Sequence, residues 1–345
     1  MRGFNLDHGT DFAGFIDGVP INQRSHPHMS GYLDLNFLMA DLVERVEFKK
    51  GIQYAENGDY SAAGSASFVL YDRLPENYVQ LRVDAEGEYR VSAAGSWDVG
   101  PGTLLLAGSH EGGDGSFDLP ANLDKNTLYA KYTQPVGDAQ LRLGFIGYQN
   151  EWTATDQIPL RAVQDGTISR FGYIDPTNGG VSKRYIASAG LEWDNAEILA
   201  YLQRSELNLF HDFTYFIDPV LGDQVEQVER RNAAGLRAKM SHDFQLFGYN
   251  ATGRIGGDAH FDWLDKAELY RTTARVRTSA IASDKVDVMS ADMWGDLTVH
   301  WSDRFRTTVG LRADYIDGEV EGLIPANAGS ESGVQWSPKI NIAYQ

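Results

Sequence analysis

The chain of 345 residues contains no cysteine. This absence excludes a disulfide framework, a thiolate metal site and a cysteine nucleophile. The chain also lacks any apolar run of the roughly eighteen residues that a transmembrane helix needs. Strands that cross a membrane as a β-barrel escape this test, because their lipid-facing residues alternate with polar ones. The sequence therefore leaves two classes open, a soluble protein and a membrane barrel.

Basic residues are scarce. Lys and Arg number 30 against 48 Asp and Glu, which gives a formal net charge of -18. Nucleic-acid binding depends on a basic surface, so we expect no nucleic-acid partner. An acidic surface favours cationic ligands or bridging divalent ions instead. The enzyme signatures G-x-S-x-G, H-E-x-x-H and the P-loop are also missing, so we expect neither catalysis nor a resident cofactor.

From Tyr78 onward, apolar and polar residues alternate with period two. The run that begins at Tyr78 reads YVQLRVDA, and the run that begins at Gln140 reads QLRLGF. One face of each run is apolar and the other carries full charges, which is the pattern of a strand between an apolar and an aqueous surrounding. A soluble β-sandwich shows the same alternation, so periodicity alone does not distinguish the two classes.

The expected connections between strands alternate in length. Short turns are expected at 98–100, 136–138, 194–195, 242–243 and 302–303, and longer connections at 112–123, 153–181, 214–223, 261–281 and 317–332. Outer-membrane barrels have short periplasmic turns and long extracellular loops. The sequence therefore predicts about a dozen antiparallel strands of such a barrel. Its largest surface loops are expected at 153–181 and 261–281.

The stretch Leu42–Phe68 reads LVERVEFKKGIQYAENGDYSAAGSASF. Charges of both signs stand beside core-sized side chains, and such charges need partners wherever they are enclosed. Gly51, Gly58 and Gly64 then divide a tract rich in turn residues. This composition indicates a compact unit of short strands and tight bends.

Two upstream elements complete the pattern. Arg2-Gly3-Phe4 is followed by Phe15-Ile16-Asp17-Gly18-Val19-Pro20 and then by the VERVE segment. In order and spacing, these segments resemble the second half of the plug domain of TonB-dependent outer-membrane receptors. Two features depart from the family pattern. Ile52 replaces the usual proline, and Gly64–Val69 replaces the closing glycine pair with its hydrophobic-Asn ending.

The resemblance implies a fold, a location and partners. It implies an all-β membrane barrel, with part of a small α+β plug domain in residues 1–76 and part of the barrel in 77–345. Receptor barrels have about 22 strands, so we expect a chain that holds the back half of a plug and the first half of a barrel. No signal peptide opens the chain at Met1, which fits such a truncation. The implied location is the cell outer membrane of a Gram-negative bacterium, and the implied partners are outer-membrane lipid, the TonB energy-transducing complex and a small ligand.

Residues 22–32 form the expected ligand loop, which by resemblance lies at the apex of the plug. The run His26-Pro27-His28 could present two imidazoles to a transition metal, or both histidines could simply be solvated. The expected ligand-binding residues are Arg24, His26, His28, Met29 and Tyr32. Two cargoes fit them, a metal held partly by His26 and His28 or an anionic chelate held by Arg24.

A second group of charges is expected to act as a latch, that is, as ion pairs that hold the plug and can be re-paired when the plug is pulled. Plug charges enclosed in a barrel must pair with one another or with the wall, and simple solvation is the alternative. The expected latch residues are Arg2, Glu44, Arg45 and Glu47. Their expected wall partners include Arg82, Asp84, Arg142 and Arg237.

The resemblance implies a receptor that takes up a scarce extracellular ligand into the periplasm when the TonB complex pulls the plug. An iron-siderophore or another metal complex is the expected cargo. Two alternatives remain open. A passive porin or structural barrel would leave Met1–Arg73 unexplained, and a soluble all-β binding module would turn its apolar faces to a shared core.

Overall fold

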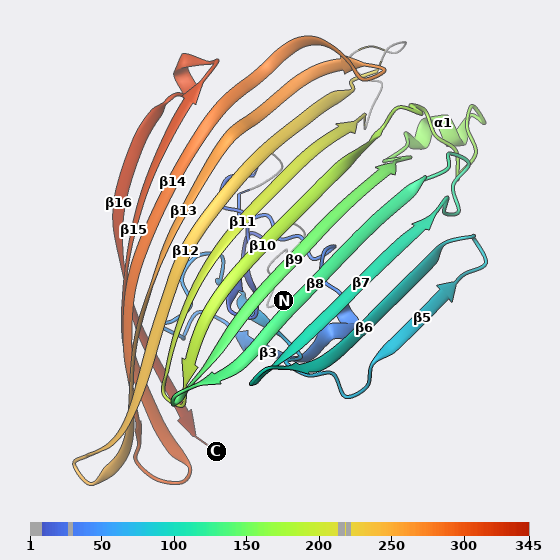
Figure 1. Ribbon diagram of the computed structural model, residues 1–345. Helices are drawn as coiled ribbons and strands as arrows, with labels where there is room; N and C mark the ends of the chain where they lie inside the picture. Colours follow the sequence, from blue (N-terminus) through green and yellow to red (C-terminus); the bar gives the residue numbers. More distant parts are fainter. Residues whose placement is uncertain (1–8, 27–29, 213–217, 219–221, 345) are drawn as a thin grey trace.

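The computed structural model describes residues 9–26, 30–212, 218 and 222–344. These residues form two β-sheets and little helix. Twelve strands make one sheet, here called the wall, and four strands make the plug sheet, which lies on the concave side of the wall (Figure 1). No helix in this part of the chain is long and apolar enough to cross a membrane.

Each wall strand pairs in antiparallel fashion with its neighbours in sequence. The strands are β5 (Tyr78–Val83), β6 (Tyr89–Val99), β7 (Gly102–Gly113), β8 (Leu123–Val136), β9 (Ala139–Thr153), β10 (Gly179–Trp193), β11 (Ala196–His211), β12 (Val225–Leu246), β13 (Tyr249–Thr273), β14 (Val276–His300), β15 (Phe305–Gly322) and β16 (Gly329–Tyr344). On β11, Leu199 and Tyr201 are buried while Ile198 and Leu202 are exposed. A register shift of one residue would reverse these faces. The prediction of about a dozen antiparallel strands is confirmed.

The connections differ between the two ends of the wall. At one end, turns occupy 100–101, 137–138, 194–195, 247–248 and 301–304. At the other, connections occupy 84–88, 114–122, 154–178, 212–224, 274–275 and 323–328. The connection 154–178 contains the short helix α1 (Leu160–Gln164), near the top in Figure 1. We call these the short-turn end and the long-loop end.

Two predicted connections are wrong. Residues 261–281 form no loop, because β13 and β14 stay paired from Phe261↔Met289 to Thr273↔Val276 and turn only at 274–275. Bulges near Leu264, Leu269 and Arg271 interrupt the period-two pattern there while the backbone ladder continues. The turn expected at 242–243 lies at 247–248, where Phe247 and Gly248 both have positive φ, as a tight hairpin turn requires.

The plug sheet contains β1 (Phe12–Ile16), β2 (Val19–Pro20), β3 (Val43–Lys50) and β4 (Gly64–Leu70), in the order β2-β1-β4-β3. Its helical content within the described residues is a single 3-10 turn, η1 (Ala40–Leu42). A second 3-10 turn, η2 (Pro325–Asn327), lies in the wall. Asn22 fastens the plug: its side chain accepts from the Gly14 amide at 2.8 Å and donates to the carbonyls of Phe12 and Gly31, each at 3.0 Å.

The hydrophobic core lies between the plug and the inner face of the wall. The buried plug residues include Ile16, Ile21, Phe37 and Leu42. The wall contributes buried residues from β6 to β11, which are Ala94, Leu105, Ala107, Tyr129, Ile146, Tyr148, Ile186, Leu199 and Tyr201. Plug and wall therefore share one core, in which apolar area is removed from water on both partners.

Candidate functional site

Wall side chains hold the plug through its backbone. On β10 and β11, Arg184 Nη2 donates to the Ile21 carbonyl and Gln203 Nε2 to the Pro20 carbonyl, each at 2.8 Å. On β12, Arg237 Nη1 donates to the Gly18 carbonyl at 2.6 Å. These bonds give partners to carbonyls in and beside β2, an edge strand of the plug sheet.

A buried lysine anchors the end of the plug sheet. Lys131 on β8 is only 3% exposed, and its Nζ lies 2.9 Å from Asp17 and 2.8 Å from Asp72. It also donates to the Leu70 carbonyl at 2.9 Å, while Tyr129 donates to Asp17 at 3.2 Å. A buried ammonium group is tolerated when it is fully paired in this way.

A third attachment joins the plug segment that follows β3 to later wall strands. Glu56 pairs with Lys49 of the plug at 2.6 Å and with Arg254 of β13 at 3.2 Å. Although burial opposes the charge, these two cations hold the pKa of Glu56 below its usual value. Arg312 of β15 donates to the carbonyls of Ala55 and Glu56 at 3.4 and 3.2 Å.

The expected latch residues on β3 do not take part in these attachments. Arg45 lies 2.9 Å from Glu44 and 3.0 Å from Glu47, and all three side chains are largely exposed. They pair with one another, one of the two arrangements we expected, and no described wall side chain pairs with them. The reason is position, because β3 lies at the edge of the plug sheet opposite to β2, the strand that wall side chains bind. Arg2 lies outside the described residues.

The expected wall partners make other contacts. Arg142 pairs with Glu192 and Glu197 of the wall, and Arg237 pairs with Asp258 at 2.5 Å. Asp84 accepts from amides of the β5–β6 turn. Arg82 does reach the plug, but its partner is Asp41 at 3.7 Å. Asp41 is bound more closely by Arg90, at 2.5 Å.

A cavity of about 440 Å³ opens between plug residues 23–36, here called the plug loop, and the wall near the long-loop end. This size is in the usual range of small-molecule sites. The plug side contributes Gln23, His26, Tyr32, Asp34 and Asn36. The wall side includes Tyr148, Asn150, Trp152, Ser182, Arg184, Ser205, Gln227 and Glu229.

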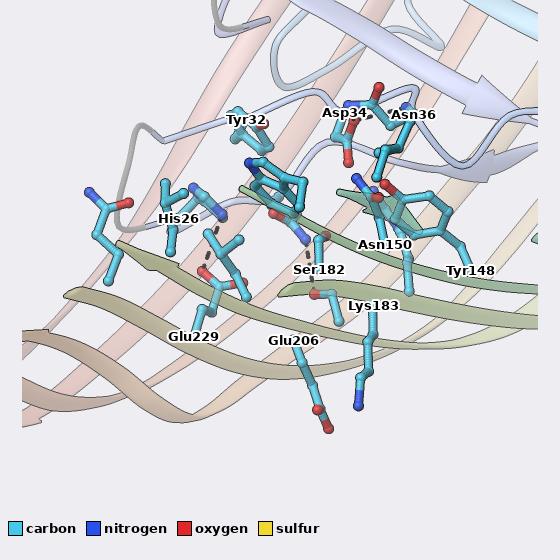
Figure 2. Close-up of a pocket in the computed structure, with 18 of the residues that line it drawn as sticks. His26, Tyr32, Asp34, Asn36, Tyr148, Asn150, Ser182, Lys183, Glu206 and Glu229 are labelled. Atoms are coloured by element: carbon cyan, nitrogen blue, oxygen red, sulfur yellow. Dashed lines mark hydrogen bonds and ion pairs between the residues drawn. The ribbon is translucent and has the colours of Figure 1, made fainter. Parts of the chain in front are cut away.

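Two of the predicted ligand residues line this pocket. The His26 ring stacks on Tyr32, with centroids 4.3 Å apart, and its Nε2 lies 3.8 Å from Glu229 Oε2 (Figure 2). Glu229 is held by Arg231, whose Nε lies 3.1 Å away. Arg231 also donates to the Ser25 carbonyl at 2.6 Å, which ties the ligand loop to β12.

The other predicted residues are placed differently. Arg24 forms an ion pair with Asp59 of the plug and is not among the residues that line the pocket. His28 and Met29 lie outside the described residues. Among the residues that the structure does describe, no group of three or more His, Cys, Asp or Glu side chains could hold a metal ion.

Sequence reasoning missed the wall side of the pocket, in particular Arg184, Gln227 and Glu229. All three are almost fully buried. Their only sequence signal is a polar residue at an inward position near the long-loop end of a strand. Glu229 and Arg231 stand on one face of β12, which period two places toward the plug.

Comparison with known proteins supports the architecture. The family model described as TonB dependent receptor-like, beta-barrel matches residues 112–345. No curated protein sequence matches the chain.

Solved structures share the fold. The unliganded ferric citrate transporter FecA matches 100% of this chain and 53% of its own, with 12% identity and a TM-score of 0.81. The pyoverdine outer membrane receptor FpvA from Pseudomonas aeruginosa PAO1 matches 96% and 53%, with 14% identity and a TM-score of 0.74. The siderophore receptor PiuA from Acinetobacter baumannii matches 99% and 55%, with 13% identity and a TM-score of 0.71. The chain thus spans about half the length of each structure, and by its family model it belongs to the TonB-dependent receptor-like β-barrels.

Proposed function

We propose that this protein binds a small extracellular ligand in the pocket between the plug loop and strands β8–β12, and that TonB-driven displacement of the plug admits the ligand. As a member of its family the protein lies in the outer membrane of a Gram-negative bacterium. The observation that carries the proposal is the pocket itself, which joins a plug loop to the long-loop end of the wall. Residues 1–76 would form the plug part and 77–345 the barrel part.

The orientation follows from the connections. Outer-membrane barrels keep short turns on the periplasmic side and long loops outside. The long-loop end, with connections 114–122 and 154–178, would therefore face the exterior. The pocket lies near this end, where a ligand would arrive first.

Two observations disfavour the alternatives. A passive porin needs an open lumen, whereas here the plug shares a buried core with β6–β11. A soluble binding module would cover its apolar residues, whereas large apolar side chains are exposed on the outer face of the wall. Examples are Leu81, Leu106, Leu128, Leu202 and Ile340.

An iron complex is the first cargo to test. The similar structures are named as carriers or receptors of ferric citrate, pyoverdine and siderophores. A metal held partly by His26 and His28 remains one proposal. An anionic chelate held by Arg24 has less support, because Arg24 is paired with Asp59 inside the plug.

Uptake of radiolabelled iron tests the proposal. The receptor, expressed from its complete gene in cells without other iron receptors, should accumulate iron from a suitable chelate, and accumulation should stop when the proton gradient is dissipated. His26→Ala should lower binding. His242→Ala is the matched control, because His242 is exposed near the short-turn end. Accumulation that continues without the gradient would indicate a porin instead.

A further inference from the structure

Within the part of the chain that the structure describes, several buried polar atoms in the pocket lack a hydrogen-bond partner. They are the acceptors Asn150 Oδ1, Gln227 Oε1 and Glu229 Oε2, and the donor Arg184 Nε. Glu229 is 1% exposed, Arg184 5% and Gln227 8%. Buried polar groups are nearly always paired in proteins, so an unpaired set that lines a cavity points to groups that a ligand supplies.

Glu229 determines which sign of ligand charge the pocket favours. The amides of Gln227 and Asn150 can turn either end toward a ligand, but a carboxylate can only accept. One oxygen of Glu229 faces Arg231 at 3.1 Å. The other lies 3.8 Å from His26 Nε2, which is too long for a hydrogen bond. This second oxygen is the acceptor that the pocket leaves open.

The neighbouring cations are already engaged. Arg184 donates to Ile21 and Gln203 and stacks on Phe37, with 4.6 Å from its guanidinium carbon to the ring centroid. Arg231 binds Glu229, Asp262 and the Ser25 carbonyl. The Lys183 side chain points away from the pocket, as does that of Glu206 (Figure 2).

The balance of charge in the pocket is therefore acidic. Asp34, Glu88 and Glu229 line it, against the guanidinium of Arg184, whose Nε has no hydrogen-bond partner among the described residues. An anion would meet only the guanidinium of Arg184, which already donates to Ile21 and Gln203, because the Lys183 side chain points away, and the excess of carboxylates would oppose it. A cation would gain a charge-assisted hydrogen bond at Glu229. The stacked pair His26 and Tyr32 adds an aromatic surface beside this point, which also favours a cation.

From this geometry we propose that the receptor selects ligands that carry a protonated amine or amidinium group, which binds Glu229 Oε2 beside the stacked His26 and Tyr32. The inference rests on the proposed function and specifies its ligand. An iron chelate would qualify through a cationic arm, whereas a chelate that bears only carboxylates would be bound weakly.

A matched pair of probes tests this selection. The first is the iron complex of a linear trihydroxamate with a free terminal amine, and the second is the same complex with the amine succinylated to a carboxylate. Binding to the purified receptor, expressed from its complete gene, is measured by quenching of tryptophan fluorescence and by retained iron. The amine probe should bind at least about tenfold more tightly, as expected for one charge-assisted contact.

Variants locate the effect. Glu229→Gln keeps the shape but removes the charge, so the ratio between the two probes should fall to about one. Glu206→Gln is the control, because this carboxylate points away from the pocket, and it should leave the ratio unchanged. Gln227→Glu adds a carboxylate at a neighbouring inward position without disturbing the Glu229–Arg231 pair. It should raise the preference for the amine probe, so a folding defect in Glu229→Gln would not hide the answer.

Three results would overturn the proposal: equal or tighter binding of the carboxylate probe, no binding of either probe, or a preference that survives Glu229→Gln and does not rise in Gln227→Glu. None of these would by itself reject the proposed function. Gradient-dependent uptake of any other iron chelate would leave the receptor function standing while removing the amine requirement.

Discussion

Two surfaces of the plug differ in how their charge in the sequence relates to their contact with the wall. Strand β3 carries the dense charges of the VERVE segment, yet Glu44, Arg45 and Glu47 are exposed and pair along their own strand. The segment 17–25 carries little charge, yet β8 and β10–β12 bind it through Lys131, Arg184, Gln203, Arg231 and Arg237. Apart from the ion pair of Lys131 with Asp17, these attachments go to backbone carbonyls, which are present at every residue and so leave no mark in the plug sequence.

The difference should appear in stability. Exposed ion pairs such as those of Arg45 contribute about 0–1 kcal/mol. Breaking a buried pair by removing one partner costs about 3–5 kcal/mol, because the other charge stays buried without compensation. We therefore expect the plug to depend on the wall cations that contact segment 17–25.

The largest effect is expected for Lys131→Met. Asp17 and Asp72 would lose their shared cation, so the free energy of unfolding should fall by about 3–5 kcal/mol. Denaturant unfolding of the purified receptor measures the change. Lys183→Met is the control, since its side chain points out of the pocket and away from the plug. Equal losses in the two variants would contradict the importance of burial.

A smaller effect, on how tightly the plug is held, is expected for Arg237→Met. The variant removes the bond to the Gly18 carbonyl and the pair with Asp258, and it weakens the contact with the Phe15 ring. The plug should be held less tightly, so outer-membrane leakage of a bulky antibiotic should increase while the receptor still folds. Arg304→Met, on the exposed short turn at 301–304, serves as the control. Unchanged leakage would mean that this contact does not retain the plug.

Much of the wall could be predicted from sequence because a strand between lipid and plug obeys period two. The run at Tyr78 and the run at Gln140 both became strands. The prediction failed at β13 and β14, where bulges near Leu264 and Leu269 shift the pattern and a paired hairpin replaces the expected loop. Backbone pairing needs no alternation, so sequence patterning marks only those parts of a strand whose two faces differ.

The site was predictable only in part, for a reason of distance along the chain. His26 and Tyr32 lie in a short loop with an evident histidine motif, and both line the pocket. Arg184 reaches Ile21 across a separation of 163 residues, and Arg231 reaches Ser25 across 206. No pattern among neighbouring residues in the sequence indicates a contact between residues so far apart. The direction in which Arg24 turns, toward Asp59, likewise depends on how the plug folds.

A modest effect of pH should distinguish the long-loop end from the plug. Burial raises the pKa of Asp156 to about 6; a hydrogen bond from the Asp212 backbone opposes the rise, and the charges of Asp212 and Asp175 add to it. Stability from neutral Asp156 is complete below its unfolded pKa of 3.8 and is lost as the pH rises through about 6. Loop 154–178 should therefore resist proteolysis better below pH 6 than above it. Asp156→Asn should resist equally at both, and a dependence that persists in this variant would assign the titration elsewhere.

Glu56 should respond in the opposite sense. Its pKa is lowered in the folded protein, so its contribution is present above its unfolded pKa of 4.5 and is lost only as the pH falls further. Mild acid should thus tighten the loop without loosening the plug at Glu56. Protease sites in the plug that become accessible between pH 6 and pH 5 would contradict this order.

The smallest effect is expected on β3. In the triple variant Glu44→Gln, Arg45→Gln, Glu47→Gln, only exposed pairs within one strand are lost, so the free energy of unfolding should change by less than about 1 kcal/mol. The variant also tests the proposal that these charges form a latch, in which they exchange ion-pair partners when the plug is pulled. If they do, gradient-dependent uptake should change while ligand binding and stability do not. If uptake also stays at the wild-type level, the charges only solvate an edge strand, and retention of the plug belongs to the wall cations that contact segment 17–25.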